Sequence, residues 1–289
     1  MKFPESELIL NPDGSTYHLH LKPGELAHKI ITVGDPSRVA KVSRHFDSIE
    51  YQRANREIIT HTGFYRGERI TVLSTGMGTG GIEIIMNELD ALVNIDLKKR
   101  EPKGAHTPLQ IIRLGTSGGL LPDIPIDSTV AAEVALGMDG MLYFYDSEPI
   151  LETDMAKAFV RQTDWITPPL PYPYFVKASE SLLQRFSGRG THSGITYTAP
   201  GFYAPQGRVL RYGLSVDIHE KIDRFSYKNQ RIVNFEMESA VIYGLAKLFG
   251  HQALSLNCII ANRALGTFSA HYQNAVEKMI GWALERWTN

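Results

Sequence analysis

Three glycine-rich turns, each directly after a short apolar run, constrain this 289-residue chain more than any other feature. They read GDPSR at residues 34–38, GMGTGG at 76–81 and GTSGG at 115–119. The apolar runs before them, 30–33, 70–74 and 110–114, are typical of buried strands, and helical patterns follow the first two turns. This repeated pattern predicts an α/β fold with much of its sheet parallel, in which ligands bind at the carboxyl ends of the strands.

The remaining apolar patterns extend this α/β arrangement evenly along the chain. We expect strands at 58–64, 130–135, 194–198 and 253–261, and helices at 36–46, 82–93, 239–249 and 272–287. Four prolines fall within residues 165–175, so we expect an irregular excursion there. Because no linker or repeat is visible, residues 1–289 are predicted to form a single domain.

Composition excludes several classes of protein. Lys and Arg number 30 against 31 Asp and Glu, which excludes a generally basic nucleic-acid binder. The single cysteine, Cys258, cannot form an internal disulfide and excludes cysteine-rich metal sites, and it suits a reducing cytoplasm. The N-terminal residues lack the apolar block of a signal peptide, and no apolar run approaches about 18 residues. We therefore expect a cytoplasmic protein without a membrane segment.

The GMGTGG turn satisfies the dinucleotide-binding pattern G-x-G-x-x-G, and Asp96 lies 20 residues beyond Gly76. A dinucleotide site, however, needs its acidic residue at the end of the next strand. Asp96 instead follows the expected helix 82–93 almost directly. Dinucleotide binding is therefore the less favoured alternative, since glycines also let a backbone pass close to other ligands.

Two of the three turns carry an arginine close to a strand end, Arg38 in the first and Arg113 before the third. A lone arginine most often pairs with a surface carboxylate. Two arginines at equivalent strand ends, together with glycine N–H groups and the Thr116 hydroxyl, favour an oxyanion pocket instead. Phosphate is the obvious anion for such a pocket.

Two further segments carry polar groups whose roles the residues alone leave open. Glu236 and Glu238 flank Met237 at a strand–helix junction, where they could cap the helix or accept hydrogen bonds from sugar hydroxyls. The segment 201–208, GFYAPQGR, offers Phe202, Gln206 and Arg208. These side chains could stack on a planar base and read its edge, or belong to an ordinary loop.

Other common chemistries lack their sequence patterns. The chain contains no G-x-S-x-G elbow, no G-x-x-x-x-G-K-[ST] phosphate loop and no H-E-x-x-H zinc motif. Its ten histidines do not fall in metal-ligand spacing, and His18 and His20 form the closest pair. We therefore expect no metal site.

Taken in chain order, the segments GDPxR, STGMG, RLGTSG and EMES resemble the nucleoside phosphorylase-I family. The resemblance covers about residues 17–268 and is weakest over 156–190. It implies a three-layer α/β/α sandwich around a mixed, partly barrel-like sheet. It also implies reversible phosphorolysis of a nucleoside, with phosphate as co-substrate and no cofactor. The implied assembly is at least a homodimer, or a hexamer, with active sites shared between paired subunits.

The resemblance also assigns roles to individual residues. The phosphate ligands it implies are Gly34, Arg38, Arg113 and Thr116, with Arg56 donated by the neighbouring subunit. For the ribose it implies Met237 and Glu238, with His18 donated in the same way. For the base it implies Ser117, Gly118, Phe202, Gln206 and Arg208, and it makes Arg208, Gln206 and Glu238 the catalytic set.

The base segment resembles the uridine phosphorylase branch of that family. Purine-specific members carry a proton-donating Asp where this chain has Asn262, and an amide cannot act as a general acid. The resemblance therefore implies phosphorolysis of uridine, or of deoxyuridine. The alternatives are a purine nucleoside phosphorylase and a nucleosidase that uses water; the arginines argue against the second.

Overall fold

An eleven-stranded sheet carries the fold in this computed structural model, which describes residues 2–167, 169–188 and 190–288. The strands of the main path are β1 (Lys29–Val33), β2 (Ser48–Asn55), β3 (Ile58–Tyr65), β4 (Glu68–Ser74), β7 (Gln110–Gly119), β8 (Thr129–Gly137), β10 (Thr191–Thr198), β11 (Ile232–Glu236), β12 (Gln252–Asn262) and β13 (Thr267–Phe268). Strand β9 (Tyr174–Lys177) pairs with β8, and β5 (Ile95–Asp96) and β6 (Glu101–Pro102) form a separate small sheet.

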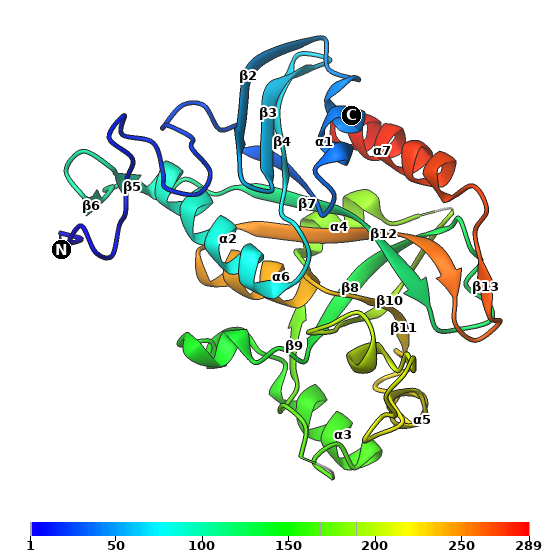
Figure 1. Cartoon of the computed structure of the whole chain (residues 1–289). Helices are drawn as coiled ribbons and strands as arrows, with labels where there is room; N and C mark the ends of the chain where they lie inside the picture. The colour runs from blue at the N-terminus through cyan, green and yellow to red at the C-terminus, as the bar shows by residue number, and fades with distance from the viewer. Residues whose placement is uncertain (1, 168, 189, 289) are drawn as a thin grey trace.

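Part of the sheet closes into a barrel-like ring of five strands (Figure 1). The ring runs β12–β8–β10–β11–β7 and closes because β12 also pairs with β7. Strands β1, β4, β3 and β2 continue from β7 as an open wing. Because β1 lies parallel to both β4 and β7, the carboxyl ends of these three strands meet at one edge.

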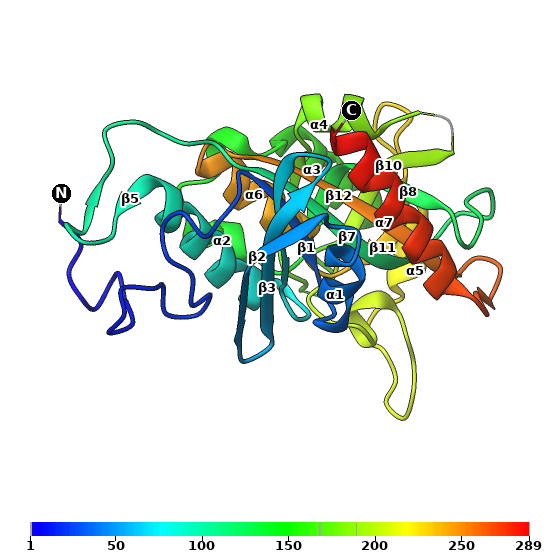
Figure 2. The ribbon, with the colours of Figure 1, turned by 90° about the horizontal axis from the view of Figure 1, so that it is seen from above.

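Helices cover both sides of the sheet. On one side α2 (Thr79–Asn94) contacts α6 (Ser239–Leu248), which packs on β8 and β12. On the other side α1 (Ser37–Ser43), α4 (Glu180–Phe186) and α7 (Tyr272–Thr288) lie together, as the view from above shows (Figure 2). The predicted three-layer sandwich with a mixed, partly barrel-like sheet is therefore confirmed. Within the described residues, no helix is both long and apolar enough to cross a bilayer.

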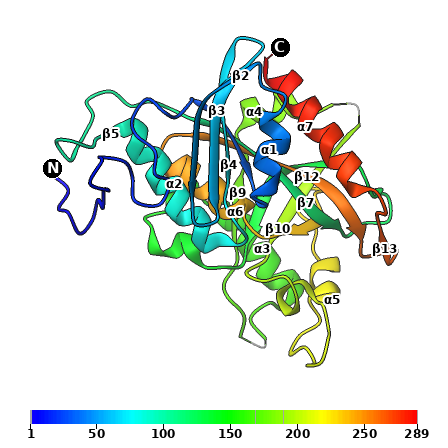
Figure 3. The same ribbon diagram turned by 45° about the horizontal axis from the view of Figure 1, so that its top comes forward.

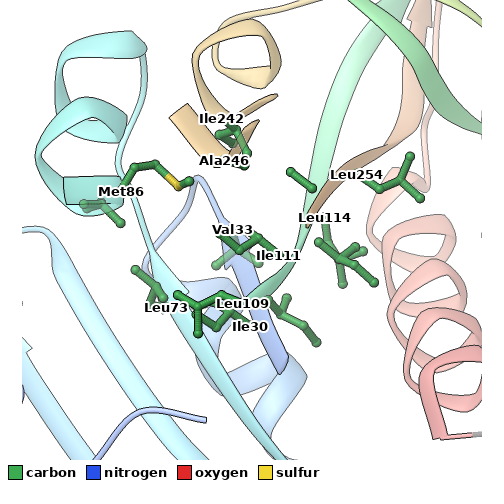
Figure 4. Close-up of a cluster of buried hydrophobic side chains, with 14 of the residues drawn as sticks. Ile30, Val33, Leu73, Met86, Leu109, Ile111, Leu114, Ile242, Ala246 and Leu254 are labelled. Atoms are coloured by element: carbon green, nitrogen blue, oxygen red, sulfur yellow. The ribbon is translucent and has the colours of Figure 1, made fainter. Parts of the chain in front are cut away.

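The main core lies between these layers (Figure 4). Met86 of α2 and Ile242 of α6 face the sheet from one side, and Val33 and Ile111 meet them from β1 and β7. All four side chains are fully or almost fully buried. A second, aromatic cluster around Phe159 fills the space between the barrel, α3 (Thr153–Thr163) and α5 (Ile218–Asp223).

The third glycine-rich segment was wrongly predicted to be a turn. Strand β7 runs through it to Gly119, one of the long strands of the barrel. The reason lies at Gly115, where a Cβ atom would overlap the Arg113 guanidinium and would lie 2.5 Å from Asn257 Oδ1. The glycine makes room for an arginine side chain that folds back along its own strand, so no chain reversal is needed.

Other boundaries differ from the prediction for local reasons. Helix α1 begins at Ser37, where Asp35 Oδ1 accepts a hydrogen bond from the Ser37 N–H at 2.9 Å, and it ends at Ser43. Strand β2 was missed because it is a largely exposed edge strand without an apolar run. The short helices α3, α4 and α5 were also missed.

The proline-rich excursion is irregular only as far as Pro173, because β9 begins at Tyr174. Trp165 anchors it: the indole is 1% exposed and its Nε1 donates to the Pro171 carbonyl at 2.9 Å. Pro168 lies outside the described residues. The assignment of residues 1–289 to a single domain stays a prediction.

Tyr243 of α6 bridges β12 and β8, two neighbouring strands of the barrel. The antiparallel pairing of β12 with β8 ends at Leu256 and Ala131. Just beyond this pair the Tyr243 hydroxyl donates to the Ala132 carbonyl at 2.7 Å and accepts from the Ser255 N–H at 2.8 Å. The hydroxyl therefore takes the place of a ladder hydrogen bond between the two strands.

Replacing this hydroxyl should weaken the fold. Tyr243→Phe leaves a buried carbonyl and a buried N–H without their partner, so we expect the free energy of unfolding to fall by about 1–3 kcal/mol. Urea denaturation measures this change. Tyr212→Phe, at a side chain that is 77% exposed, is the matched control. Equal stabilities of the two variants would contradict the bridging role.

Candidate active site

A cavity of about 740 Å³ opens where the carboxyl ends of β1, β4, β7 and β11 meet. Every site residue predicted from the sequence lines it, except His18 and Arg56. The eleven that line it are Gly34, Arg38, Arg113, Thr116, Ser117, Gly118, Phe202, Gln206, Arg208, Met237 and Glu238. The structure therefore brings together residues from Gly34 to Glu238, far apart in the chain, as the strand-end argument requires.

Two arginines form one end of the cavity. Arg113 is 5% exposed; its Nη2 pairs with Glu238 Oε2, and its Nε lies 3.8 Å from Glu236 Oε2. Nη1 and Nε of Arg113 have no hydrogen-bond partner within the described residues. Arg38 donates from Nη1 to the Leu114 carbonyl at 3.1 Å. Buried guanidinium N–H groups without partners are ready donors for an oxyanion.

The charges at this end are strongly coupled. Burial opposes the charge of Arg113, but the facing carboxylates of Glu238 and Glu236 outweigh it, so the pKa of Arg113 is raised. Burial, followed by repulsion from Arg113, lowers the pKa of Arg38. An anion bound between the two guanidinium groups would relieve that repulsion.

The two glutamates around Met237 have different roles. Glu236 caps α6: its Oε2 accepts from the Glu238 and Ser239 N–H groups at 3.0 and 2.9 Å. Its Oε1 accepts from the Thr198 hydroxyl at 2.5 Å. Glu238 lines the cavity, and its Oε1 accepts from the Gly78 N–H at 2.7 Å. Both readings that the sequence left open therefore find support, one for each carboxylate: a helix cap and an acceptor facing the cavity.

The segment 201–208 contributes a second group of lining residues. Gln206 is 3% exposed, and its Oε1 accepts from Arg208 Nη1 at 2.5 Å. The Arg208 guanidinium also lies 3.8 Å from the centre of the Phe202 ring, a cation–π distance. An aromatic face, an amide and a guanidinium thus stand together. The segment that follows, 209–217, projects outward beside them (Figure 3).

His18 and Arg56 lie next to each other outside the cavity. The Asn55 amide donates to the His18 carbonyl at 2.9 Å, and the Arg56 guanidinium lies 6.0 Å from the Tyr17 ring centre. His18 Nδ1 lies 2.7 Å from Glu88 Oε1. The two residues that the resemblance assigns to a neighbouring subunit therefore share one surface of this chain.

Comparison with known proteins places most of the chain in one family. A family model described as the phosphorylase superfamily matches residues 28–286. The chain belongs to this superfamily. Its curated relatives include a uridine phosphorylase of Thermococcus kodakarensis, 31% identical, with 92% of this chain and 84% of the relative covered. They also include a purine nucleoside phosphorylase of Listeria monocytogenes, 26% identical, with 93% and 97% covered.

Solved structures of the phosphorylase superfamily have the same fold. A Trypanosoma brucei nucleoside phosphorylase, described as showing uridine phosphorylase activity, matches with a TM-score of 0.86 and 30% identity over 97% of this chain and 99% of that one. A uridine phosphorylase of the oomycete Phytophthora capsici matches at 21% identity with a TM-score of 0.68. The second supports the fold alone. The family resemblance found in the sequence is thus confirmed.

Several cavity residues of this phosphorylase-superfamily chain were missed from the sequence. The most informative is Arg263, directly after β12, whose Nη1 lies 3.4 Å from the Gln206 carbonyl. Its position just past a strand end follows the rule that singled out Arg38, so sequence reasoning could have found it. Phe235, Ile260 and Phe268 add apolar walls and carried no comparable signal.

Asn262 is not a free amide in the cavity. Its Nδ2 donates to the carbonyls of Leu121 and Ile124 at 2.8 and 2.9 Å, and its Oδ1 accepts from the Leu265 N–H at 3.0 Å. Both ends of the amide are therefore occupied by backbone. Asn262 holds the end of β12 in place and presents no acid to a ligand.

The dinucleotide reading of the GMGTGG turn finds no support in the geometry. Asp96 lies in β5, which pairs with β6 in the small separate sheet and not with the main sheet. Its carboxylate accepts from the N–H groups of Lys98 and Lys99. The glycine turn instead delivers the Gly78 N–H to Glu238.

One group of metal-ligand side chains does come together, at the opposite, amino end of β12. Asp90, His106 and His251 place their ligand atoms within 4.8 Å of one another. His251 Nδ1 accepts from the Leu109 N–H at 3.2 Å, so the proton of the neutral ring sits on Nε2, which lies 3.3 Å from Asp90 Oδ1. A protonated Nε2 cannot ligate a metal, and the cluster fits an imidazole–carboxylate contact.

The role of Glu236 as the cap of α6 leads to a prediction about stability. Glu236→Ala removes the acceptor for two buried N–H groups and a hydroxyl, so we expect the free energy of unfolding to fall by about 2–4 kcal/mol. Thermal and urea denaturation measure this loss. Glu180→Ala, at an exposed carboxylate in the first turn of α4, should cost far less. A loss no greater than that of the control would contradict the cap.

Proposed function

We propose that this protein catalyses the reversible phosphorolysis of uridine, giving uracil and ribose 1-phosphate. In this reaction a pentosyl group passes from the base to phosphate, which makes the enzyme a pentosyltransferase. Deoxyuridine is the second substrate that the proposal includes. Phosphate enters as a co-substrate, and the scheme calls for no cofactor.

The observation that carries the proposal is the arrangement of the cavity. The donors for an oxyanion, Arg38 and Arg113, form one group in the lining, and Phe202, Gln206 and Arg208, proposed to read the base, form a second group in the same lining. Glu238 lies on the wall of the same cavity and pairs with Arg113. A nucleoside bound with its base against the second group is proposed to present its sugar to Glu238 and its C1′ towards a phosphate held by the first group.

The mechanism follows from this placement. Phosphate is already a nucleophile, so the site must hold one of its oxygens beneath C1′ and stabilise the charge as it moves. Gly34, Arg38, Arg113 and Thr116 are proposed to hold the phosphate. Glu238, next to Met237, accepts hydrogen bonds from the ribose hydroxyls and lies near the developing positive charge of the sugar.

The leaving base needs stabilisation of negative charge on its ring and carbonyl oxygens. Arg208 is proposed to supply it, while Gln206 pairs with N3–H and a carbonyl. Phe202 packs on the ring, and Ser117 and Gly118 border it. A guanidinium aimed at a developing anion in a water-poor site contributes about 2–4 kcal/mol, or roughly 10² to 10³ in rate.

Two related reactions fit the site less well. A purine nucleoside phosphorylase needs a proton donor where Asn262 stands, and that amide is bound at both ends by backbone. A nucleosidase would use water and would have no use for Arg38 or for the N–H groups of Arg113 that find no partner among the described residues. The uridine-cleaving relatives at 30–31% identity support the pyrimidine choice over the purine relative at 26%.

The proposal extends to the assembly and the location of the protein. His18 and Arg56 are proposed to reach the ribose and the phosphate of a neighbouring subunit, which makes the functional unit at least a homodimer, within a dimer or a hexamer. A cytoplasmic location is also proposed, and the buried, unpaired thiol of Cys258 is in keeping with it.

The reaction and its base preference can be tested together. Purified protein with uridine and phosphate should release uracil, and release should stop when phosphate is left out. Inosine and adenosine should react much more slowly, because Gln206 and Arg208 are arranged for a pyrimidine and no acid replaces Asn262. The change in ultraviolet absorbance as each nucleoside loses its base measures the rate of each reaction. Faster cleavage of inosine, or full cleavage without phosphate, would overturn the proposal.

The proposal that each active site is shared between two subunits can be tested separately from the base preference. Arg56→Ala removes the donated phosphate ligand and Arg113→Ala removes one from the receiving subunit, so each variant alone should be nearly inactive. In a mixed dimer, one site carries both lesions and the other carries none. Random pairing puts about half of the dimers in this mixed form, so roughly a quarter of all sites should be active.

Activity after co-expression or joint refolding measures this recovery. Native mass spectrometry confirms that subunits have exchanged. Mixtures no more active than the separate variants, despite confirmed exchange, would mean that Arg56 does not act across the interface.

A further inference from the structure

The base-reading turn rests on a histidine that no part of the proposed mechanism uses. His219 lies in the first turn of α5, half-buried, with its ring edge-to-face against Phe235 at 5.5 Å between ring centres. Gly207, between Gln206 and Arg208, has φ +68° and lies directly against this ring. A Cβ at Gly207 would come within 2.6 Å of His219 Cδ2, so the turn and the imidazole are built to fit each other.

The imidazole also contacts Arg263, which lies beside Gln206 in the cavity lining. Arg263 Nη2 lies 3.2 Å from His219 Nε2, and Arg263 Nη1 lies 3.4 Å from the Gln206 carbonyl. A guanidinium only donates hydrogen bonds, so His219 Nε2 must accept and must therefore be unprotonated. Arg263 forms no ion pair with a carboxylate within the described part of the chain, which leaves this imidazole and the carbonyl as its anchors.

We propose that neutral His219 is a positioning residue of the base subsite: its Nε2 holds the Arg263 guanidinium against the Gln206 carbonyl and so fixes the turn that presents Gln206 and Arg208 to the base. This inference rests on the proposed function and adds to it a residue outside the cavity. It also implies that base recognition depends on pH.

The charges around His219 set the sense of that dependence. Burial, and then the Arg263 guanidinium, lowers the pKa of His219, while Asp217, Asp223 and the Gln206 carbonyl oppose the shift. The ring is therefore neutral at and above the ordinary histidine range. As the pH falls through the lowered pKa, Nε2 becomes a donor, loses its bond to Arg263 and repels it. The affinity for the nucleoside should then fall. The affinity for phosphate should not, because neither His219 nor Arg263 belongs to the residues proposed to hold phosphate.

Two variants of His219 separate its role as a hydrogen-bond acceptor for Arg263 from its change of protonation state with pH. In His219→Gln an amide oxygen can accept from Arg263 but cannot be protonated in this range. In His219→Leu the acceptor is gone. The control is His28→Gln, an exposed histidine at the amino end of β1. The measured quantities are the KM for uridine at saturating phosphate and the KM for phosphate, each from pH 5.5 to 8.

We expect the KM of the wild type for uridine to rise severalfold at the acid end, and the His28→Gln control to follow it. His219→Gln should keep the wild-type KM near pH 7.5 and lose the acid rise. His219→Leu should raise the KM for uridine about tenfold at pH 7.5, the scale for one hydrogen bond to a charged group. The KM for phosphate should not change in either variant.

An unchanged KM for uridine in His219→Leu, or an acid rise that persists in His219→Gln, would overturn the role of His219. A wild type that does not cleave uridine would instead contradict the proposed function. The contact between His219 and Arg263 can also be tested without a substrate. This second test applies if the wild type does not cleave uridine, or if His219→Leu does not fold. NMR can follow the pKa of His219, whose signal is assigned by its loss in His219→Gln. We expect this pKa to rise in Arg263→Met, because the neighbouring positive charge is removed. A pKa equal to that of the wild type would overturn the contact.

Discussion

The buried ion pair between Arg113 and Glu238 is the interaction on which the site depends. It joins the middle of β7 to the turn between β11 and α6, two segments 125 positions apart in the chain. Each member would be costly to bury alone, because an unpaired charge in the interior carries a desolvation penalty of several kcal/mol. Paired, the two charges fix the relative positions of β7 and of the turn between β11 and α6, both of which line the cavity.

The surrounding backbone is arranged to make this pair possible. Gly115 leaves room for the Arg113 side chain to fold back along β7, and Gly78 donates its N–H to the free oxygen of Glu238. Glu236 caps α6, so Glu238 is not needed as the cap and faces the cavity. The pairing does not use all of the donors of Arg113, and its remaining N–H groups are those that a phosphate would engage.

The sequence made the architecture and most of the cavity predictable, for a physical reason. Parallel strands end at a common edge, so short apolar runs followed by polar turns identify side chains that meet in space. Arg38, Thr116 and Glu238 follow from this rule. The residue types of 201–208 suggested a base-stacking segment, and the family resemblance favoured that role over an ordinary loop. The rule also applies to Arg263, which was overlooked.

What the sequence could not supply depends on long-range packing. A glycine-rich segment predicts a turn by its conformational freedom, and only the barrel shows that Gly115 serves a neighbouring side chain instead. Strand β2 lacks an apolar run because it is an exposed edge. His219 carries no motif, and its contact with Arg263 exists only because α5 packs beneath the 201–208 segment.

The central claim is that Arg113 serves the phosphate while Glu238 serves the sugar, within one ion pair. Calorimetric titration of phosphate into the wild type, Arg113→Met and Glu238→Gln tests it most directly. The account predicts that phosphate affinity falls at least about tenfold in Arg113→Met, which loses charge-assisted hydrogen bonds to the anion. In Glu238→Gln it should stay the same or rise, because a negative charge beside the anion is removed. Equal losses in the two variants, or no loss in Arg113→Met, would contradict the account.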